Sequence, residues 1–418
     1  MIRRIRLAQL ALLPILAVTL ASFNTSDAKT RYVEIWGSNT NPNCSRSQPC
    51  RNIQHAINQS GANDRIVVGP GEYFGNLTIF SHQSGLKLES TAGRFATIIR
   101  PGLDIDGLTI EAPRVRVGGK GKGFTFQGPE VALGALPTTE GNGIVGNVDA
   151  ENLRIEGNRF QWNRRGLWIE NGMRASIRNN IALMNLWTGI FCASCERSII
   201  QDNRVEYTGG QGIYIVSASS RTSVRRNIAT GNGDDGIASS SLIGQHARVQ
   251  DNVTEQNDVH GFDLHLPAGN FMGNISTDNG SYGVGLSLYG NNGSGVGVGR
   301  GNVKQNLSAL NGLGGFSLES PDEAKIENNF SAHNGTYGFN FFGGIFNGNP
   351  RVRNNSSIDS FCGMYNGVTD NFVFTGQYFG NHDGSETCGP DTYDTDNSCR
   401  RDTPVPVRVN RARAVAGG

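Results

Sequence analysis

One spacing recurs along most of this sequence. An asparagine is followed nine residues later by a glycine, and the pair returns eight times, mostly at intervals of 22 to 25 residues. A constant offset inside a repeat of variable length indicates that each repeat is one structural unit. Gly166 begins one earlier, slightly irregular unit. The pairs are Asn180 and Gly189, Asn203 and Gly212, Asn227 and Gly236, Asn252 and Gly261, Asn274 and Gly283, Asn306 and Gly315, Asn329 and Gly338, and Asn354 and Gly363.

A short alternating run follows these glycines. Ile213, Tyr214 and Ile215 follow Gly212, for example. Alternation predicts a strand with one buried face. Repeated units of this length, each with short strands and Gly/Asn turns, stack into a solenoid whose parallel sheets run along its axis. Asparagines at one repeated turn can hydrogen-bond from unit to unit and satisfy backbone groups that the bend exposes. The sequence therefore predicts an all-β, right-handed parallel β-helix.

The first 28 residues have the pattern of a cleaved secretory signal. A basic start that includes Arg3 and Arg6 precedes an apolar run over 7–20, and small residues follow up to Ala28. The run is too short to span a membrane. We expect a mature protein of residues 29–418, secreted to the extracellular space or the periplasm and free of the membrane once cleaved. An uncleaved anchor is the alternative.

The mature chain is expected to form one domain with a cap. Ile53, Ala56 and Ile57 predict a short helix that closes the open end of the solenoid. The last residues contain several arginines and two prolines but no repeat. The predicted division is a cap with the first coil over 29–80, the β-helix coils over 81–385 and a terminal tail over 386–418.

Seven cysteines remain, and secretion permits disulfides. Cys44 and Cys50 are close enough in sequence to form a disulfide that holds the entry segment. Cys192 and Cys195 form a single C-x-x-C, and a zinc site needs a second pair that the chain lacks. Near the end we expect one bridge and one free thiol among Cys362, Cys388 and Cys399.

The bulk charge and composition bear on both the partners and the architecture of the chain. The formal net charge is +1, which gives no reason to expect nucleic acid or a membrane surface as a partner. With 57 glycines and few charges, the chain suits tightly wound short strands rather than a bulky helical core. We expect a monomer.

The alternation also assigns the outer face. With the glycine as position zero, plus one and plus three point inward, and plus two and plus four point outward. Trp168, Phe191 and Tyr214 are successive outward residues, and an exposed aromatic row suits the stacking of sugar rings. The alternative is that a loop covers them. The whole plus-two row is Trp168, Phe191, Tyr214, Ala238, Asp263, Gly285, Ser317, Asn340 and Tyr365.

A polar cluster is predicted beside this row. Neighbouring coils lie about 4.8 Å apart, so groups on adjacent coils can crowd one patch and shift one another's pKa values. Asp263 and His265 both face outward, which favours a functional role for them. Asp234 and Asp235 fit turn chemistry or a supporting role, and small neighbours leave room for a ligand. The cluster is Asp234, Asp235, Asp258, His260, Asp263 and His265, with Ala238 and Gly285 beside it.

A glycine-rich stretch follows over residues 289–295, where the repeat grows to 32 residues from Asn274 to Asn306. It is interpreted either as a lid over the cluster or as a tolerated insertion.

Two resemblances sharpen this interpretation. Residues 64–73, after the predicted capping helix, resemble the entry of pectin-lyase-like β-helix proteins. The run His260-Gly261-Phe262-Asp263-Leu264-His265 is similar to the Tyr-Gly-Phe-Asp-Pro-His segment of mannuronan C5-epimerases, which are secreted β-helix enzymes acting on alginate.

The resemblance implies roles for three residues. Asp263 and His265 would take the family's catalytic positions, and His260 stands where the family has a proton-transferring tyrosine. Leu264 replaces the proline, and the preceding coil lacks the family's lysine. Removal of the C5 proton of a uronic acid requires groups that neutralise the carboxylate and exchange the proton. An acidic polysaccharide is the implied substrate, and Arg165 could help to bind it.

Two other functions remain open. Asn232 to Gly236, followed by Val259 to Gly261, is similar to the paired-Asp and Gly-His-Gly segments of polygalacturonases, where carboxylates hydrolyse the chain. A further Asp and an Arg-x-Lys segment of that family are missing. The third function is non-catalytic carbohydrate binding or surface structure. No cofactor is required, and Ca²⁺ is compatible with clustered Asp and a uronate.

Overall fold

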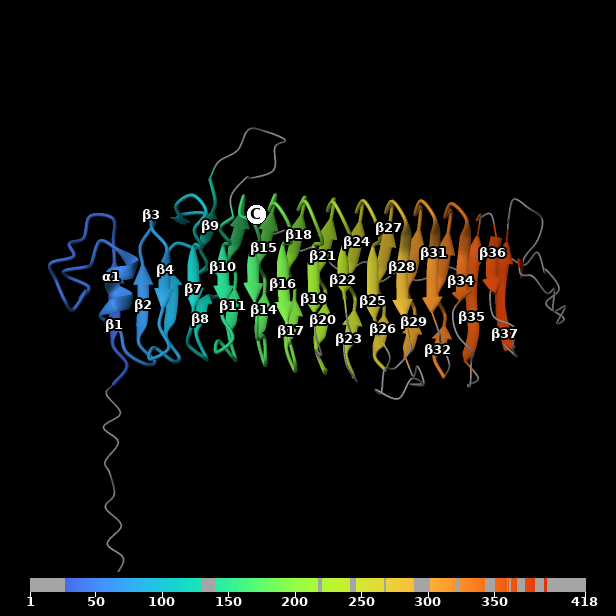
Figure 1. Ribbon diagram of the computed structural model, residues 1–418, viewed down its shortest axis with the longest axis horizontal. Helices are drawn as coiled ribbons and strands as arrows, with labels where there is room; N and C mark the ends of the chain where they lie inside the picture. The colour runs from blue at the N-terminus through green and yellow to red at the C-terminus, as the bar shows by residue number, and fades with distance from the viewer. Residues whose placement is uncertain are drawn as a thin grey trace, which may run out of the picture.

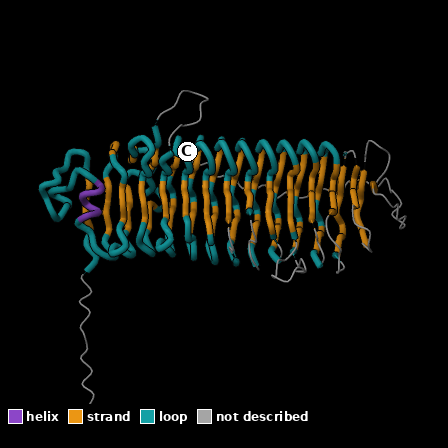
Figure 2. The backbone as a smooth tube through the Cα atoms, viewed as in Figure 1, coloured by secondary structure: helices purple, strands orange, loops and turns teal. Residues whose placement is uncertain are grey.

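Each sequence repeat forms one coil of a parallel β-helix, and the coils stack along one long axis (Figure 1). The computed structural model describes residues 27–129, 140–216, 220–240, 246–266, 268–288, 301–319, 323–342, 350–358, 360, 362–366, 373–379 and 387–388. Strands form the sides of the coils and turns form their corners (Figure 2). The predicted all-β solenoid is confirmed.

Three ladders of parallel strands run along the axis. One forms a 13-stranded sheet in the described part of the chain, which we call the front sheet. Its strands are β4 (Leu77–Ile79), β7 (Leu108–Ile110), β10 (Ile144–Gly146), β13 (Leu167–Ile169), β16 (Ile190–Ala193), β19 (Ile213–Val216), β22 (Ile237–Ser239), β25 (Phe262–His265), β28 (Tyr282–Ser287), β31 (Gly314–Glu319), β34 (Tyr337–Phe342), β36 (Cys362–Asn366) and β38 (Thr387–Cys388).

The other two ladders meet at β35 and together form a 25-stranded sheet. The first contains β1 (Thr30–Val33), β2 (Arg65–Val68), β5 (Lys87–Ser90), β8 (Arg116–Gly118), β11 (Arg154–Glu156), β14 (Ser176–Arg178), β17 (Ile199–Gln201), β20 (Ser223–Arg225), β23 (Arg248–Gln250), β26 (Asn270–Met272), β29 (Asn302–Lys304), β32 (Lys325–Glu327), β35 (Arg351–Ile358) and β37 (Val373–Phe379). The second contains β3 (Gly71–Phe74), β6 (Thr97–Arg100), β9 (Thr125–Gln127), β12 (Arg159–Gln161), β15 (Ile181–Leu183), β18 (Arg204–Glu206), β21 (Ile228–Thr230), β24 (Val253–Glu255), β27 (Ile275–Thr277), β30 (Leu307–Ala309) and β33 (Phe330–Ala332).

The predicted register of the front sheet is confirmed. Each plus-two residue is the direct partner of the next one, from Trp168 on β13 to Tyr365 on β36. The plus-one and plus-three residues are buried, as Ile213 and Ile215 are at 0 % exposure. The interior is therefore filled by alternate residues of each strand, and the outward residues form rows along the axis.

Asparagine side chains form the expected ladder inside one corner. The Oδ1 atom of Asn227 accepts hydrogen bonds from both the backbone N–H and the Nδ2 of Asn203, each at 3.0 Å. Its own Nδ2 donates to Asn252 at 3.0 Å and to the carbonyl oxygen of Ile200 at 2.9 Å. Each buried asparagine thus satisfies backbone groups of a neighbouring coil.

The last step of this ladder corrects the sequence assignment. Asn355, not Asn354, accepts the hydrogen bond from the backbone of Asn329, at 3.0 Å. The pairing of β35 shifts between Arg353 and Asn355, and Asn354 has a φ of 51°. Asn354 therefore corresponds to Asn328, which precedes the ladder asparagine of the previous coil, and Asn355 lies only eight residues before Gly363 because this coil has one residue fewer between the asparagine and the glycine.

A second asparagine ladder, which the sequence reasoning missed, follows the first by five residues. The backbone N–H of Asn232 donates to Oδ1 of Asn257 at 3.1 Å, and that of Asn257 donates to Asn279 at 3.1 Å. Its members are Asn163, Asn185, Asn232, Asn257, Asn279, Asn311 and Asn334, with Thr208 taking the position in one coil.

The repeated glycine is required by close packing between coils. A Cβ atom on Gly212 would lie 2.6 Å from the carbonyl oxygen of Gly236 and 2.9 Å from Nδ2 of Asn232. Such contacts are closer than non-bonded atoms tolerate, so a side chain here would force the coils apart. The offset seen in the sequence therefore records two requirements, a stacked asparagine and a glycine against the next coil.

A short helix covers the N-terminal end of the solenoid. The helix α1 (Ile53–Asn58) packs on β1, β2 and β4, and Ile53, Ala56 and Ile57 are buried as predicted. Cys44 and Cys50 are joined in this region, as expected, and Cys192 is bonded to Cys195. Among the described residues, no helix is long and apolar enough to cross a membrane.

Some expectations fall outside the described residues. These are the signal segment up to residue 26, the glycine-rich stretch 289–295, and Cys399 with most of the tail. They remain predictions.

Candidate functional site

Three aromatic rings pack against one another on the front sheet. The ring centroids of Trp168 and Phe191 are 6.1 Å apart, and those of Phe191 and Tyr214 are 5.8 Å apart, both edge to face. All three rings are half-buried. The Arg165 guanidinium lies 4.5 Å from the Trp168 ring centroid and 5.5 Å from that of Phe191. The four predicted substrate-binding residues therefore form one cluster.

Two residues that the sequence reasoning missed extend this cluster. The Trp187 ring, which is 43 % exposed, lies 4.1 Å from the Arg164 guanidinium and 4.8 Å from that of Arg165. Arg164 also forms an ion pair with Glu140. Trp187 lies two residues before Gly189, outside the plus-two row, so the alternation rule gave no signal for it. Flat rings and guanidiniums together suit a ring-shaped anionic ligand.

On the two coils that follow Tyr214 along the front sheet, Asp235 hydrogen-bonds His260. The Oδ1 atom of buried Asp235 accepts hydrogen bonds from the backbone N–H of His260, at 3.0 Å, and from its Nδ1, at 2.9 Å. Both residues directly precede a repeated glycine, so they are neighbours on adjacent coils. With the proton held on Nδ1, Nε2 is the ring atom left to exchange a proton, and it lies 3.4 Å from Oγ of Ser281. Asp235 thus fixes the tautomer and the orientation of His260.

The surroundings of His260 raise its pKa. Burial lowers the pKa of His260, but the hydrogen bond to Asp235 and the charges of Asp235, Asp263 and Asp234 outweigh it. The ring also lies parallel to that of Tyr282 on the next coil, with centroids 6.0 Å apart. His260 therefore keeps its proton to higher pH than an ordinary histidine, which suits a group that both accepts and donates a proton.

Asp263 lies on the outer face of β25 with space on both sides. Its register partners are Ala238 and Gly285, and a Cβ atom on Gly285 would meet only ordinary contacts, the nearest at 3.4 Å. The side chain is exposed, yet the surrounding cluster desolvates the carboxylate and raises its pKa. Repulsion from Asp235, Asp234 and Glu319 adds to this rise, and His260 opposes it. Asp263 is a carboxyl group that binds a proton more readily than usual.

The other predicted site residues differ in how closely they are associated with Asp235, His260 and Asp263. His265 is two residues beyond Asp263 on the same outer face, and its backbone N–H donates to Oγ of Ser239 at 2.9 Å. Asp234 accepts a hydrogen bond from Gln211, and burial together with Asp235 raises its pKa. The Asp258 carboxylate makes no hydrogen bond or ion pair with the cluster in the described part of the chain. Asp235, His260 and Asp263 form the centre.

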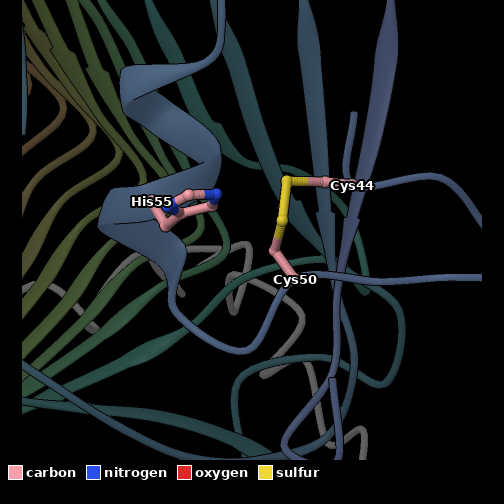
Figure 3. A group of neighbouring side chains, drawn as sticks. All are labelled: Cys44, Cys50 and His55. Carbon is pink, nitrogen blue, oxygen red and sulfur yellow. A yellow bond between two sulfur atoms is a disulfide. The ribbon is translucent and has the colours of Figure 1, made fainter. Parts of the chain in front are cut away.

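Two groups of described residues bring potential metal ligands together. In the first, one ligand atom from each of Asp235, His260 and Asp263 lies within 4.8 Å of the others. The second is Cys44, Cys50 and His55, where His55 of α1 lies beside the disulfide (Figure 3). Its two sulfur atoms are bonded to each other, so neither is a thiolate that could bind a metal. Only the first group retains its ligands.

Comparisons with known proteins agree with the fold. The A-modules of the mannuronan C-5 epimerases AlgE4 and AlgE6 from Azotobacter vinelandii superpose with TM-scores of 0.51 and 0.52 at 15 % and 14 % identity. The superpositions cover 77 % and 81 % of this chain and 94 % of each module. The Dettilon tailspike protein gp208 gives 0.50 at 13 % identity, covering 80 % of this chain and 62 % of the tailspike. At these identities the likeness establishes the fold alone. No curated protein matches in sequence.

A family model gives the classification. The model described as "Right handed beta helix region" matches residues 69–229 and 142–297, which together span more than half of the chain. The matched residues include β3 to β28, and they contain both the aromatic cluster and the Asp235–His260 pair. The chain belongs to the right-handed β-helix family.

Proposed function

We propose that the protein acts on a uronic-acid-containing polysaccharide outside the cell and removes the proton on C5, leading to epimerisation or β-elimination. The observation that carries this proposal is the Asp235–His260 pair beside a carboxyl group of raised pKa, Asp263. The resemblance of residues 260–265 to the epimerase segment supports the same chemistry. The cationic aromatic cluster on the same sheet supports an acidic polymer as the ligand.

The chemistry follows from the protonation states. Asp263, whose pKa is already raised, takes up a proton as the negatively charged substrate carboxylate approaches, and with His265 beside it then hydrogen-bonds that carboxylate and reduces its negative charge. Nε2 of neutral His260 then accepts the C5 proton, and the electron pair of the C–H bond moves into the carboxylate. Asp235 stabilises the imidazolium that results. Reprotonation of C5 from the opposite face by a solvent proton, with the imidazolium of His260 returning its proton to solvent, gives the epimer. Loss of the C4–oxygen bond, with a proton delivered to the leaving oxygen, gives an unsaturated end.

Hydrolysis is the second candidate, and one observation favours it. Carboxylate oxygens of Asp235 and Asp263 lie within 4.8 Å of each other, close to the ~5 Å separation of retaining glycosidases. However, Oδ1 of Asp235 already accepts two hydrogen bonds from His260. A hydrolase that used this oxygen would have to break the best-defined contact of the site.

The proposed reaction requires no cofactor, because His260 and Asp263 supply the acid and base groups. Asp263 and a uronate carboxylate have the hard oxygen donors that Ca²⁺ prefers, so a shared calcium ion is compatible with the same cluster. Turnover measured in EDTA and in added calcium distinguishes a reaction without a cofactor from one that uses calcium. Equal rates would leave calcium without a role.

Product type tests the proposal. Wild-type protein is incubated with alginate, polygalacturonate and glucuronan while ultraviolet absorbance and reducing ends are measured. His260→Gln is expected to lower turnover by about 100-fold or more, and His82→Gln, an exposed histidine on another coil, should leave it unchanged. Reducing ends without absorbance would identify a hydrolase. Full turnover by both His260→Gln and His265→Gln would contradict the assignment, and polymer binding without any product would leave a binding protein.

A further inference from the structure

A loop on another face of the molecule carries an unusual combination of side chains. Residues 91–96 connect β5 to β6, at the corner between the two ladders of the 25-stranded sheet. Thr125 on β9 donates its hydroxyl to the carbonyl oxygen of Arg94, at 2.6 Å. The Arg94 side chain donates to the carbonyl oxygen of Asn179, at 3.0 Å and 85 residues away. The loop is thereby held along the corner over several successive coils.

This anchoring presents an aromatic ring to solvent. The Phe95 side chain is 67 % exposed, although an apolar ring gains free energy when it is removed from water. The Arg94 and Arg159 guanidinium carbons lie 5.3 Å and 5.9 Å from its ring centroid. Two cations therefore flank one exposed ring.

Neither cation is neutralised by the described part of the chain. Within those residues, no carboxylate lies within ion-pair distance of Arg94 or Arg159. Nearby arginines behave differently, because Arg65 pairs with Glu89 at 2.7 Å and Arg116 approaches the same carboxylate at 3.9 Å. The pKa of Arg94 is lowered by burial and by the charge of Arg159. This pair of like charges is left without an internal counter-charge.

We propose that Arg94, Phe95 and Arg159 form a second carbohydrate site, which binds an acidic sugar residue of a polysaccharide away from the front sheet. The sugar ring stacks on Phe95, and its carboxylate takes hydrogen bonds from the two guanidiniums, whose planar forks match a carboxylate. The site would hold the protein on an acidic polymer whether or not a chain occupies the front sheet. It does not depend on the proposed C5 chemistry.

Binding measurements test this site apart from catalysis. Affinity for polygalacturonate and for alginate is measured by calorimetry, in a His260→Gln background so that no product forms. The double variant Arg94→Gln/Arg159→Gln is expected to lose about tenfold or more in affinity, as loss of charge-assisted hydrogen bonds implies. The charge-matched double variant Arg46→Gln/Arg51→Gln, at exposed positions near the N-terminal end, should lose little.

A further variant and other ligands distinguish a uronate site from an effect of bulk charge, from a site for sulfated polymers and from a dimer interface. Phe95→Ala should weaken binding while keeping its salt dependence, because the charges remain. Equal losses in the two double variants would reduce the effect to bulk charge and overturn the proposal. Retention of sulfated polymers but not polyuronates, or a dimer in solution that Phe95→Ala dissolves, would overturn it as well. Thermal unfolding of each variant confirms that the fold is intact, and failure of catalysis alone leaves this prediction standing.

Discussion

At the scale of single residues, the site depends on contacts that cross from coil to coil. Asp235 and His260 are 25 residues apart, and their hydrogen bond exists because both occupy the position before the repeated glycine. The sequence pattern marked His260, Asp263 and His265 as outward or cluster residues. It ranked Asp235 as a turn residue, because Asp-Asp-Gly is ordinary turn chemistry. Only the register of adjacent coils assigns Asp235 to His260.

Asp235→Asn should move the pH dependence of turnover. Asp235 raises the pKa of His260, so its removal should lower that pKa toward the ordinary histidine value near 6.5. The neutral base then forms at lower pH, and the acidic limb of kcat/KM shifts to lower pH while the maximal rate falls. The pH profile of the variant, measured beside the wild type, checks this. An unchanged acidic limb with a lower rate would mean that Asp235 has only a structural role.

Asp263→Asn should stabilise the fold while abolishing turnover. The folded-state pKa of Asp263 is raised, so its contribution favours the folded state only at acidic pH and is lost as pH rises through that pKa. At neutral pH the charged group is repelled by its neighbours, and the neutral amide removes this repulsion. We expect Tm at pH 7 to rise by about 1–3 °C, and the difference to shrink toward pH 4. A lower Tm at pH 7 would contradict this electrostatic account.

At the scale of elements, the sequence repeat determined which residues stack. The Asn and Gly positions predicted the plus-two row residue by residue, because each coil is pinned by a buried asparagine at one corner and a glycine at close approach. The second asparagine ladder was present in the sequence five residues after the first, but only one offset was followed. Asn354 was assigned one residue too early, since this coil has one residue fewer between the ladder asparagine and Gly363, and Asn354 beside it happens to fit the nine-residue offset.

Replacing one ladder asparagine should lower the free energy of unfolding by more than its own hydrogen bonds contribute, because its buried partners are left unsatisfied. Asn227→Ala removes an acceptor for two donors of Asn203 and a donor to Ile200 and Asn252, all buried. Unsatisfied buried groups predict a loss of about 2–4 kcal/mol in the free energy of unfolding, measured with urea. Asn43→Ala, on an exposed loop, is the matched control and should change it by less than about 0.5 kcal/mol. Equal values for both variants would exclude a structural role for the ladder.

At the scale of the whole molecule, the β-helix places its binding groups at regular intervals along its axis. Arg165 and His260 occupy the same position of their coils, four coil steps apart, which is about 19 Å at the 4.8 Å spacing of adjacent strands. An extended polymer along the front sheet would reach both groups, and a short oligosaccharide at His260 would not. The sequence predicted Arg165 and His260 as site residues, but neither Trp187 nor the Arg94 loop, which lie outside the alternating strands.

Arg165→Gln should therefore act only on long substrates. Its kcat/KM on polymer should fall several-fold, because the cationic residue beside the aromatic cluster no longer contributes to binding. On a disaccharide or trisaccharide the variant and the wild type should be equal. Kinetics on a series of defined oligosaccharide lengths checks this, with Arg46→Gln as control. An equal fall at every length would place Arg165 in direct support of the reacting residue instead.

Deuterium exchange at C5 tests the central claim most directly. The protein is incubated with alginate, polygalacturonate and glucuronan in deuterated buffer, and the polymers are examined by proton NMR. We expect deuterium at C5 or new unsaturated ends on at least one polymer, and neither signal with His260→Gln. Polymers that keep every C5 proton, with or without new reducing ends, would contradict the proposed proton abstraction.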